Sequence, residues 1–272
     1  MFFLFLMRLS VLLVMMPLFL IVLTILVKGI PSMSLDMITE TPKGGFYMGK
    51  EGGVLNAIAG SFYLSASATL LAVAISLPAV IFLNVYQRRG SAFAWFIRLC
   101  MDVMAGVPSI VFGAFGFLVM LFFGLKVSLL AGIITVTLLI MPMTIRSMDE
   151  MMKTVPLQLM QSTYSLGATR IETALVVVIR VLPGLITAML ISFGRAIGDA
   201  ASVIFTAGFT DNIPHSVYQP AATLPLAIFF QLSSPVPQVR ERAYAAALIL
   251  TFIILLISYG ARFISRRFSN DH

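Results

Sequence analysis

Two oppositely charged side chains, Arg195 and Asp199, interrupt the apolar and small residues of the segment ISFGRAIGDA. A guanidinium group carries several donors in a planar fork that fits the oxygens of phosphate or another oxyanion. A spacing of four residues places both side chains on one face of a helix, where they are able to bond to each other. The pair therefore indicates either an anion contact, in which Asp199 limits how tightly Arg195 holds the anion, or a structural salt bridge.

The rest of the chain is apolar enough to lie in a membrane. Of its 272 residues, 60% are hydrophobic and 11% are charged, and the mean hydropathy is +1.02. Crossing the hydrocarbon core takes about 20 helical residues. Stretches without charge occupy residues 9–27, 52–87, 103–125, 127–145 and 243–261, and a further stretch, 181–207, has only Arg195 and Asp199 as charges. We predict an all-α integral membrane protein with six transmembrane helices, in which the charged pair lies near the middle of the fifth.

A charged side chain in such a helix needs a polar surrounding. At the centre of a bilayer it costs roughly 2.5 to 3.5 kcal/mol on insertion scales, so it usually faces protein or water and marks a solute path. Gly194 and Gly198 add the G-x-x-x-G spacing, which lets a neighbouring helix approach closely. We therefore expect the charged pair to face a solute path or a second subunit, with the two glycines at a helix packing contact.

The distribution of lysine and arginine predicts the orientation. Sorting the loops alternately places most of these residues, among them Arg88, Arg146 and Lys153, on one side. The positive-inside rule makes that side cytoplasmic, with both termini inside. The net charge of +7 fits this topology and anionic lipid headgroups. Because no soluble segment carries a basic stripe with interleaved aromatic residues, we do not expect nucleic acid as a partner.

Histidine and cysteine are too scarce for most site chemistry. His215 and His272 are the only histidines, and Cys100 is the only cysteine. A zinc cluster, a dithiol site or a histidine-based triad needs more such residues than the chain supplies. We therefore expect no metal site, no bound cofactor and no enzymatic activity in this chain.

The segment between the fourth and fifth predicted spans, residues 146–180, carries clear helix punctuation. Pro156 favours the start of a short helix, and Gly167 suits the left-handed residue just beyond its end. Thr169 and Glu172 then have the spacing of a capping box, in which side chains satisfy the free amides of a new helix. The sequence predicts a short cytoplasmic helix, a glycine elbow and a second helix. Leu157, Met160 and Tyr164 recur at helical spacing, so either the membrane domain itself or a separate partner must cover them.

Over nearly the whole length beyond the first span, the chain resembles the permease subunits of bacterial phosphate ABC importers. The elbow followed by Leu182-Pro183 is similar to the coupling loop of ABC-importer permeases in general, and GRAIGDAASVIFTAG is similar to a segment of the phosphate branch. Further similar segments are GGVLNAIAGSFYLS (52–65), AGVPSIVFGAFG (105–116), SLLAGIITVTLLIMPMTIRSMDE (128–150) and TLPLAIF (223–229). The chain departs from the family pattern at Gln161-Ser162-Thr163, where an acidic residue is usual, and at Asp199-Ala200, where glutamate and threonine are usual.

The resemblance implies a type I ABC-importer permease architecture and assigns roles to residues. An ATP-binding subunit would dock on the coupling helix; the coupling residues are Tyr164, Leu166, Gly167, Ala168 and Thr169. The substrate path would include Arg195, Asp199 and Arg146, the last of which could equally be a cytoplasmic anchor. The chain would divide into a first helix with an external loop (1–50), a permease core (51–267) and a cytoplasmic tail (268–272).

The resemblance also implies partners and a location. These are two ATP-binding subunits that hold ATP and magnesium, a paralogous permease chain or a second copy of this one, an external phosphate-binding protein, and the lipid of the bacterial inner membrane. Two alternatives stay open. The cargo could be another oxyanion, such as sulfate, molybdate or phosphonate. A secondary transporter or channel without ATP would instead predict an internal repeat or several buried acidic and histidine residues.

Overall fold

The structure is a computed structural model that describes residues 2–43, 51–88 and 90–269. The end of the predicted external loop and residues 270–272 of the predicted tail therefore lie outside the described residues. Within these ranges, five helices are long and apolar enough to span a membrane. They are α1 (Phe2–Gly29), α3 (Leu55–Ile81, continued by the π-helical η3, Phe82–Tyr86), α6 (Leu129–Lys153), α8 (Arg170–Gly198) and α10 (Pro237–Ser269).

The stretch 103–125, predicted as one span, is not one continuous helix. The chain instead forms two helices, α4 (Ala92–Ala105) and α5 (Ser109–Phe122), that are bent by 99° relative to each other. Gly106 ends α4, and Pro108, in an extended conformation with φ −57° and ψ 140°, begins α5. Proline lacks an amide donor and crowds the preceding turn, so Pro108 favours a break between α4 and α5. The predicted count of six spans holds only if this bent pair counts as one span.

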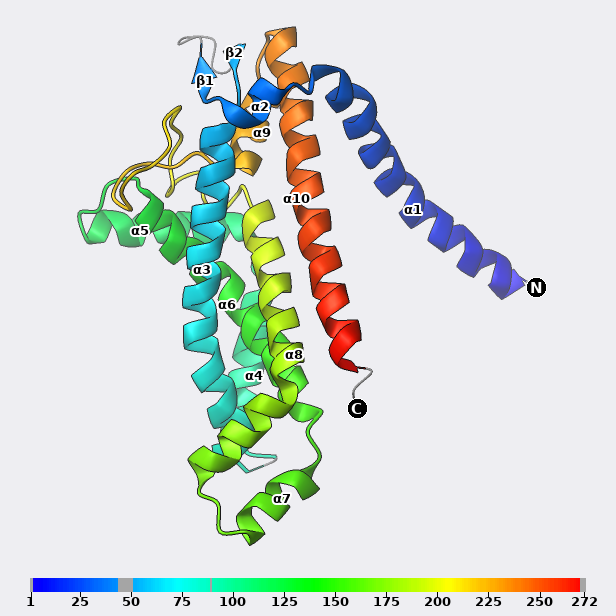
Figure 1. Cartoon of the computed structure of the whole chain (residues 1–272), viewed down its shortest axis with the longest axis vertical. Coiled ribbons are helices and arrows are strands. Elements are labelled where there is room, and N and C mark those ends of the chain that lie inside the picture. Colours follow the sequence, from blue (N-terminus) through cyan, green and yellow to red (C-terminus); the bar gives the residue numbers. More distant parts are fainter. Residues whose placement is uncertain (1, 44–50, 89, 270–272) are drawn as a thin grey trace.

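Short elements lie at the two ends of the bundle (Figure 1). One end carries α2 (Leu35–Thr39), the antiparallel pair β1 (Pro42–Lys43) and β2 (Glu51–Gly52), and α9 (Leu224–Leu232); η1 (Ile30–Ser32) joins α1 to α2. In the β pair, Pro42 lies opposite Gly52. The other end carries α7 (Leu157–Ser165), between α6 and α8. The predicted coupling helix therefore projects from the bundle at the end opposite α9.

The core lies where α3, α6 and α8 meet. Small and branched side chains such as Ala68, Val136 and Ile140 are fully buried there. Hydroxyl groups in the same region bond across helices, as in the 2.8 Å contact between Thr144 Oγ1 and Ser192 Oγ. By contrast, α1 contacts α10 near its C-terminal end, at Gly29, and its N-terminal part projects away from the bundle (Figure 1). Most of its apolar side chains are exposed. Exposed apolar surface of this kind is expected of a helix that faces lipid.

Candidate functional site

The predicted charged pair sits at the end of a helix and not near its middle. The last residue of α8 is Gly198, and Asp199 follows in an extended conformation, with φ −87° and ψ 126°. Its carboxylate accepts hydrogen bonds from the Ser202 amide (2.8 Å) and the Ser202 hydroxyl (2.5 Å). Asp199 thus caps the helical turns that run on to Ala207. The structure shows no bond between Arg195 and Asp199, which was one of the two alternatives; both bonds from Ser202 end on one oxygen of the carboxylate.

Arg195 is exposed on α8. Among the described residues, its guanidinium makes no ion pair and no hydrogen bond. Ser192, one turn earlier on α8, is buried against α6. Arg195 therefore carries a charge that has no partner among the described residues. It lies on α8 next to the face through which α8 packs on α6.

The two predicted packing glycines face different surroundings. A side chain at Gly194 would meet no atom within 4 Å, whereas one at Gly198 would lie 3.7 Å from Ile254 of α10. No helix among the described residues uses this G-x-x-x-G face for a close approach. A packing role against a second subunit stays a prediction. The tight approaches occur elsewhere, as at Gly60, where a Cβ would clash with the carbonyl of Ala222.

The glycine elbow is confirmed in detail. Gly167 has φ +85°, and its amide donates to the Tyr164 carbonyl (3.0 Å), while the Ala168 amide donates to the Thr163 carbonyl (3.1 Å). This pair of bonds is the Schellman arrangement that ends a helix with a left-handed residue. The capping box follows directly, with the Thr169 amide donating to Glu172 (2.7 Å) and the Glu172 amide donating to the Thr169 hydroxyl (3.4 Å). The elbow is therefore fixed by backbone bonds at the end of α7 and by side-chain caps at the start of α8.

The apolar residues of the elbow are only partly covered. Met160 packs against the cluster that contains Val177 and Met152. Leu157 and Tyr164 are about two-fifths exposed, and Leu166 is 88% exposed at the tip of the elbow. The membrane domain therefore covers one side of α7 and leaves a projecting apolar surface, which is typical of a docking site for another protein.

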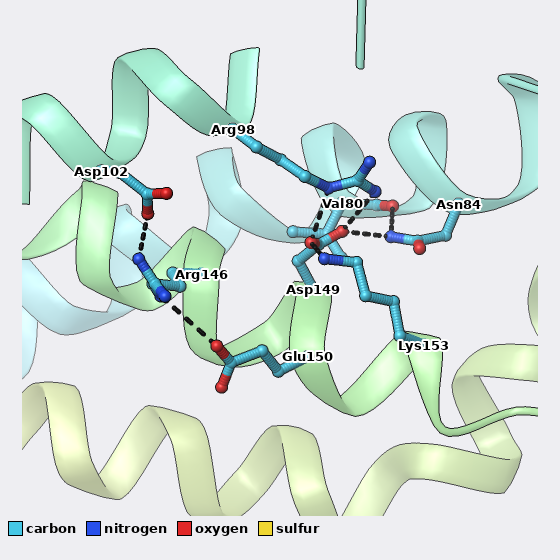
Figure 2. A network of polar contacts seen from close by, with 8 residues as sticks. All are labelled: Val80, Asn84, Arg98, Asp102, Arg146, Asp149, Glu150 and Lys153. Carbon is cyan, nitrogen blue, oxygen red and sulfur yellow. Dashed lines mark hydrogen bonds and ion pairs between the residues drawn. The ribbon is translucent and has the colours of Figure 1, made fainter. Parts of the chain in front are cut away.

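Arg146 lies in a charged cluster at the α7 end of the bundle (Figure 2). Its guanidinium donates to Asp102 of α4 and, at 3.3 Å, to Glu150 of α6. The neighbouring Asp149 accepts two bonds from Arg98, at 2.8 and 2.9 Å. Asp149 also pairs with Lys153 and accepts a 2.7 Å bond from Asn84. Unlike Arg195, Arg146 is held between two carboxylates.

Arg195 and Arg146 lie at different heights along the helix bundle. The Thr144–Ser192 contact fixes α6 against α8, and Met151 of α6 lies against Gly184 of α8, so the two helices run antiparallel. Arg195 lies three residues after Ser192, and Arg146 lies two residues after Thr144, on opposite sides of that contact. An anion that moves along the bundle would therefore meet Arg195 and Arg146 one after the other. Arg98 and Asp149 were not singled out from the sequence, although charges at 146, 149, 150 and 153 share one face of a helix.

The chain also matches a known protein family. The family described as the inner membrane component of binding-protein-dependent transport systems matches residues 81–270. The chain belongs to this family. As such it is a multi-pass membrane protein and a transport subunit.

Individual relatives of the family match nearly the whole chain. The phosphate transport system permease protein PstA of Haemophilus influenzae is 30% identical over 250 residues, covering 89% of this chain and 85% of that protein. PstA of Yersinia pestis is 32% identical over 238 residues, with 87% and 80% covered. A probable ABC transporter permease of Bacillus subtilis, YqgI, is 26% identical over 256 residues, with 88% and 86% covered.

A solved structure supports the fold. A chain of the inward-facing methionine ABC transporter MetNI superposes with a TM-score of 0.61 at 19% identity. The match covers 78% of this chain and 96% of that one. The predicted all-α type I importer permease architecture is therefore confirmed.

Proposed function

We propose that this permease subunit carries inorganic phosphate into the cell in an ATP-driven importer. The observation that carries the proposal is the identity of 30 to 32% with phosphate transport permeases over almost nine-tenths of the chain. A substrate is contacted by particular side chains, and we propose that Arg195 is one of them.

Arg195 is the proposed anion contact. Its charge is unpaired within the described chain and projects from a spanning helix, so a passing anion meets a donor fork without first displacing a carboxylate. A guanidinium binds phosphate oxygens in a bidentate manner. Arg146, predicted as a second contact, would have to leave Asp102 and Glu150 to do the same.

Asp199 positions this site because its carboxylate caps the turns that follow α8. We expect Asp199→Asn to keep uptake near the wild-type level, because an amide oxygen also accepts the Ser202 bond. Asp199→Ala loses the cap, which is worth about 1 kcal/mol, and lets the turns after α8 shift relative to Arg195, so uptake should fall below that of the asparagine variant. Uptake of labelled phosphate, normalised to the amount of protein in the membrane, measures both. A loss in the asparagine variant as deep as that in the alanine variant would show that the charge of Asp199 matters, and not its cap.

ATP is proposed to act from outside the chain. One ATP-binding subunit docks on α7, where Leu166 and Tyr164 project, and a second docks on the paired permease chain. These two subunits hold the ATP and magnesium. A paralogous permease or a second copy completes the path beside the α8 face of Gly194, and an external binding protein delivers phosphate. Both termini lie in the cytoplasm. The chain divides into the first helix with an external loop (1–50), the permease core (51–267) and a cytoplasmic tail (268–272).

Co-purification tests the dependence on ATP. A tagged chain, extracted in mild detergent from cells that express the complete system, should retain an ATPase subunit. A Leu166→Asp variant should lose that subunit while staying in the membrane, because it places a charge in the proposed apolar contact. A lone chain that transports phosphate without any ATPase would overturn the proposal in favour of a secondary transporter or channel.

A further inference from the structure

Two ion pairs of opposite polarity join α4 to α6 (Figure 2). Arg98 of α4 binds Asp149 of α6, and Asp102 of α4 binds Arg146 of α6. We call these four residues the α4–α6 clamp. Each helix contributes one cation and one carboxylate, so the clamp is neutral and does not form a site for an anion.

The two pairs differ in burial. The Asp149 side chain is 5% exposed, and it receives Arg98 through two nitrogens. Asp102 and Arg146 are each about half exposed. A cavity of about 90 Å³ lies between the pairs and is lined by all four clamp residues. The inner pair is thus part of the packed structure, while the outer pair is open to substitution.

The order of the charges along α4 and α6 favours one alignment of the two helices. Arg98 and Asp102 lie one turn apart on α4, and Arg146 and Asp149 lie one turn apart on α6. Sliding one helix by a turn places Arg98 opposite Arg146 in one direction, or Asp102 opposite Asp149 in the other. Like charges in contact repel, so either slip is disfavoured while the observed register satisfies both pairs.

The clamp lies at the root of the coupling helix. Lys153, the last residue of α6, pairs with Asp149, and α7 begins only four residues later, at Leu157. Asn84 of η3, which continues α3, donates to the same carboxylate. A displacement of α7 that pulls on α6 therefore reaches α4 through the clamp and the end of α3 through Asn84.

We propose that the clamp residues are positioning residues that make α4, α6 and the end of α3 move as one body with α7. This inference rests on the proposed ATP-driven function, and it gives Arg146 a role that requires no contact with the anion. It predicts that the partnership of Asp102 and Arg146 matters and that the identity of the residue at each position does not.

An exchange of charges tests this proposal. Phosphate uptake is measured in vesicles that contain the complete importer, for Asp102→Arg, for Arg146→Asp and for the double variant. Each single variant puts like charges together and should lower the maximal rate about tenfold at an unchanged half-saturating phosphate concentration. The double variant should recover most of the rate. Glu150→Gln, which leaves the interhelical pair intact, is the matched control and should behave as wild type.

The opposite results are distinct. If the double variant is as inactive as Arg146→Asp, or if the half-saturating concentration rises, Arg146 acts on the anion and the proposal is wrong. If the exchanged protein does not accumulate, the alanine variants at both positions form a double-mutant cycle, and additive effects would overturn the proposal. Sulfate and molybdate are assayed in parallel. A wild-type complex that carries one of these and not phosphate refutes the proposed cargo and still reports on the clamp.

Discussion

Replacing Gly167 by valine should reduce ATP-driven uptake at least tenfold while the protein stays in the membrane. Gly167 has φ +85°, and no atom lies within 4 Å of the position of a side chain there. The damage is therefore conformational and not steric. A left-handed conformation costs a residue with a side chain roughly 1–2 kcal/mol, and a β-branched residue more, which favours rearrangement of the elbow. Uptake per amount of membrane protein measures the loss.

Gly167→Asn is the matched control. Asparagine tolerates the left-handed region and occurs at this position of helix ends. Uptake in the asparagine variant should therefore lie close to wild type and well above that of the valine variant. Wild-type uptake in Gly167→Val would show that the rigid elbow is not needed for coupling.

Arg195→Gln should lower phosphate uptake by roughly ten- to a hundredfold. Glutamine keeps donors and much of the length but loses the charge, and a hydrogen bond to a charged group is worth about 1.5–3 kcal/mol. Since the Arg195 side chain is exposed and makes no ion pair among the described residues, the fold should be little affected. Initial rates over a range of phosphate concentrations, with protein abundance as reference, give the size of the effect.

Arg195→Lys separates charge from geometry. Lysine keeps the charge as a point ammonium and loses the planar fork, so it should recover part of the rate lost in glutamine. A glutamine variant with the wild-type rate and half-saturating concentration would remove Arg195 from the translocation path.

Local signals in the sequence were sufficient for the elbow. Thr169 and Glu172 form the predicted capping box, and Gly167 adopts the predicted left-handed conformation, because both features depend on residues within a few positions of each other. Four of the long spans, α1, α3, α6 and α10, follow likewise from uninterrupted hydropathy. The fifth, α8, was predicted at 181–207 and lies at Arg170–Gly198. Membership of a permease family was indicated by short motifs in the same segments and is confirmed.

Features that depend on competition between partners were not predictable in this way. Spacing allowed Asp199 to bond to Arg195, but α8 ends at Gly198 and the carboxylate accepts bonds from the amide and hydroxyl of Ser202. Hydropathy gave 103–125 as one span, and although a proline such as Pro108 can kink a helix, the 99° angle between α4 and α5 follows only from the packing of the two helices. The bond between Arg98 and Asp149 joins residues 51 positions apart, so only the packing of α4 on α6 reveals it.

Uptake of labelled phosphate into vesicles that contain the complete importer tests the central claim most directly. ATP, binding protein and vesicle-bound subunits are supplied together, and sulfate, molybdate and a phosphonate are added as competitors. We predict uptake that requires ATP, is not reduced by the competitors at equal concentration, and falls in Arg195→Gln. ATP-dependent uptake of a competitor in place of phosphate, or phosphate uptake without ATP, would contradict the account.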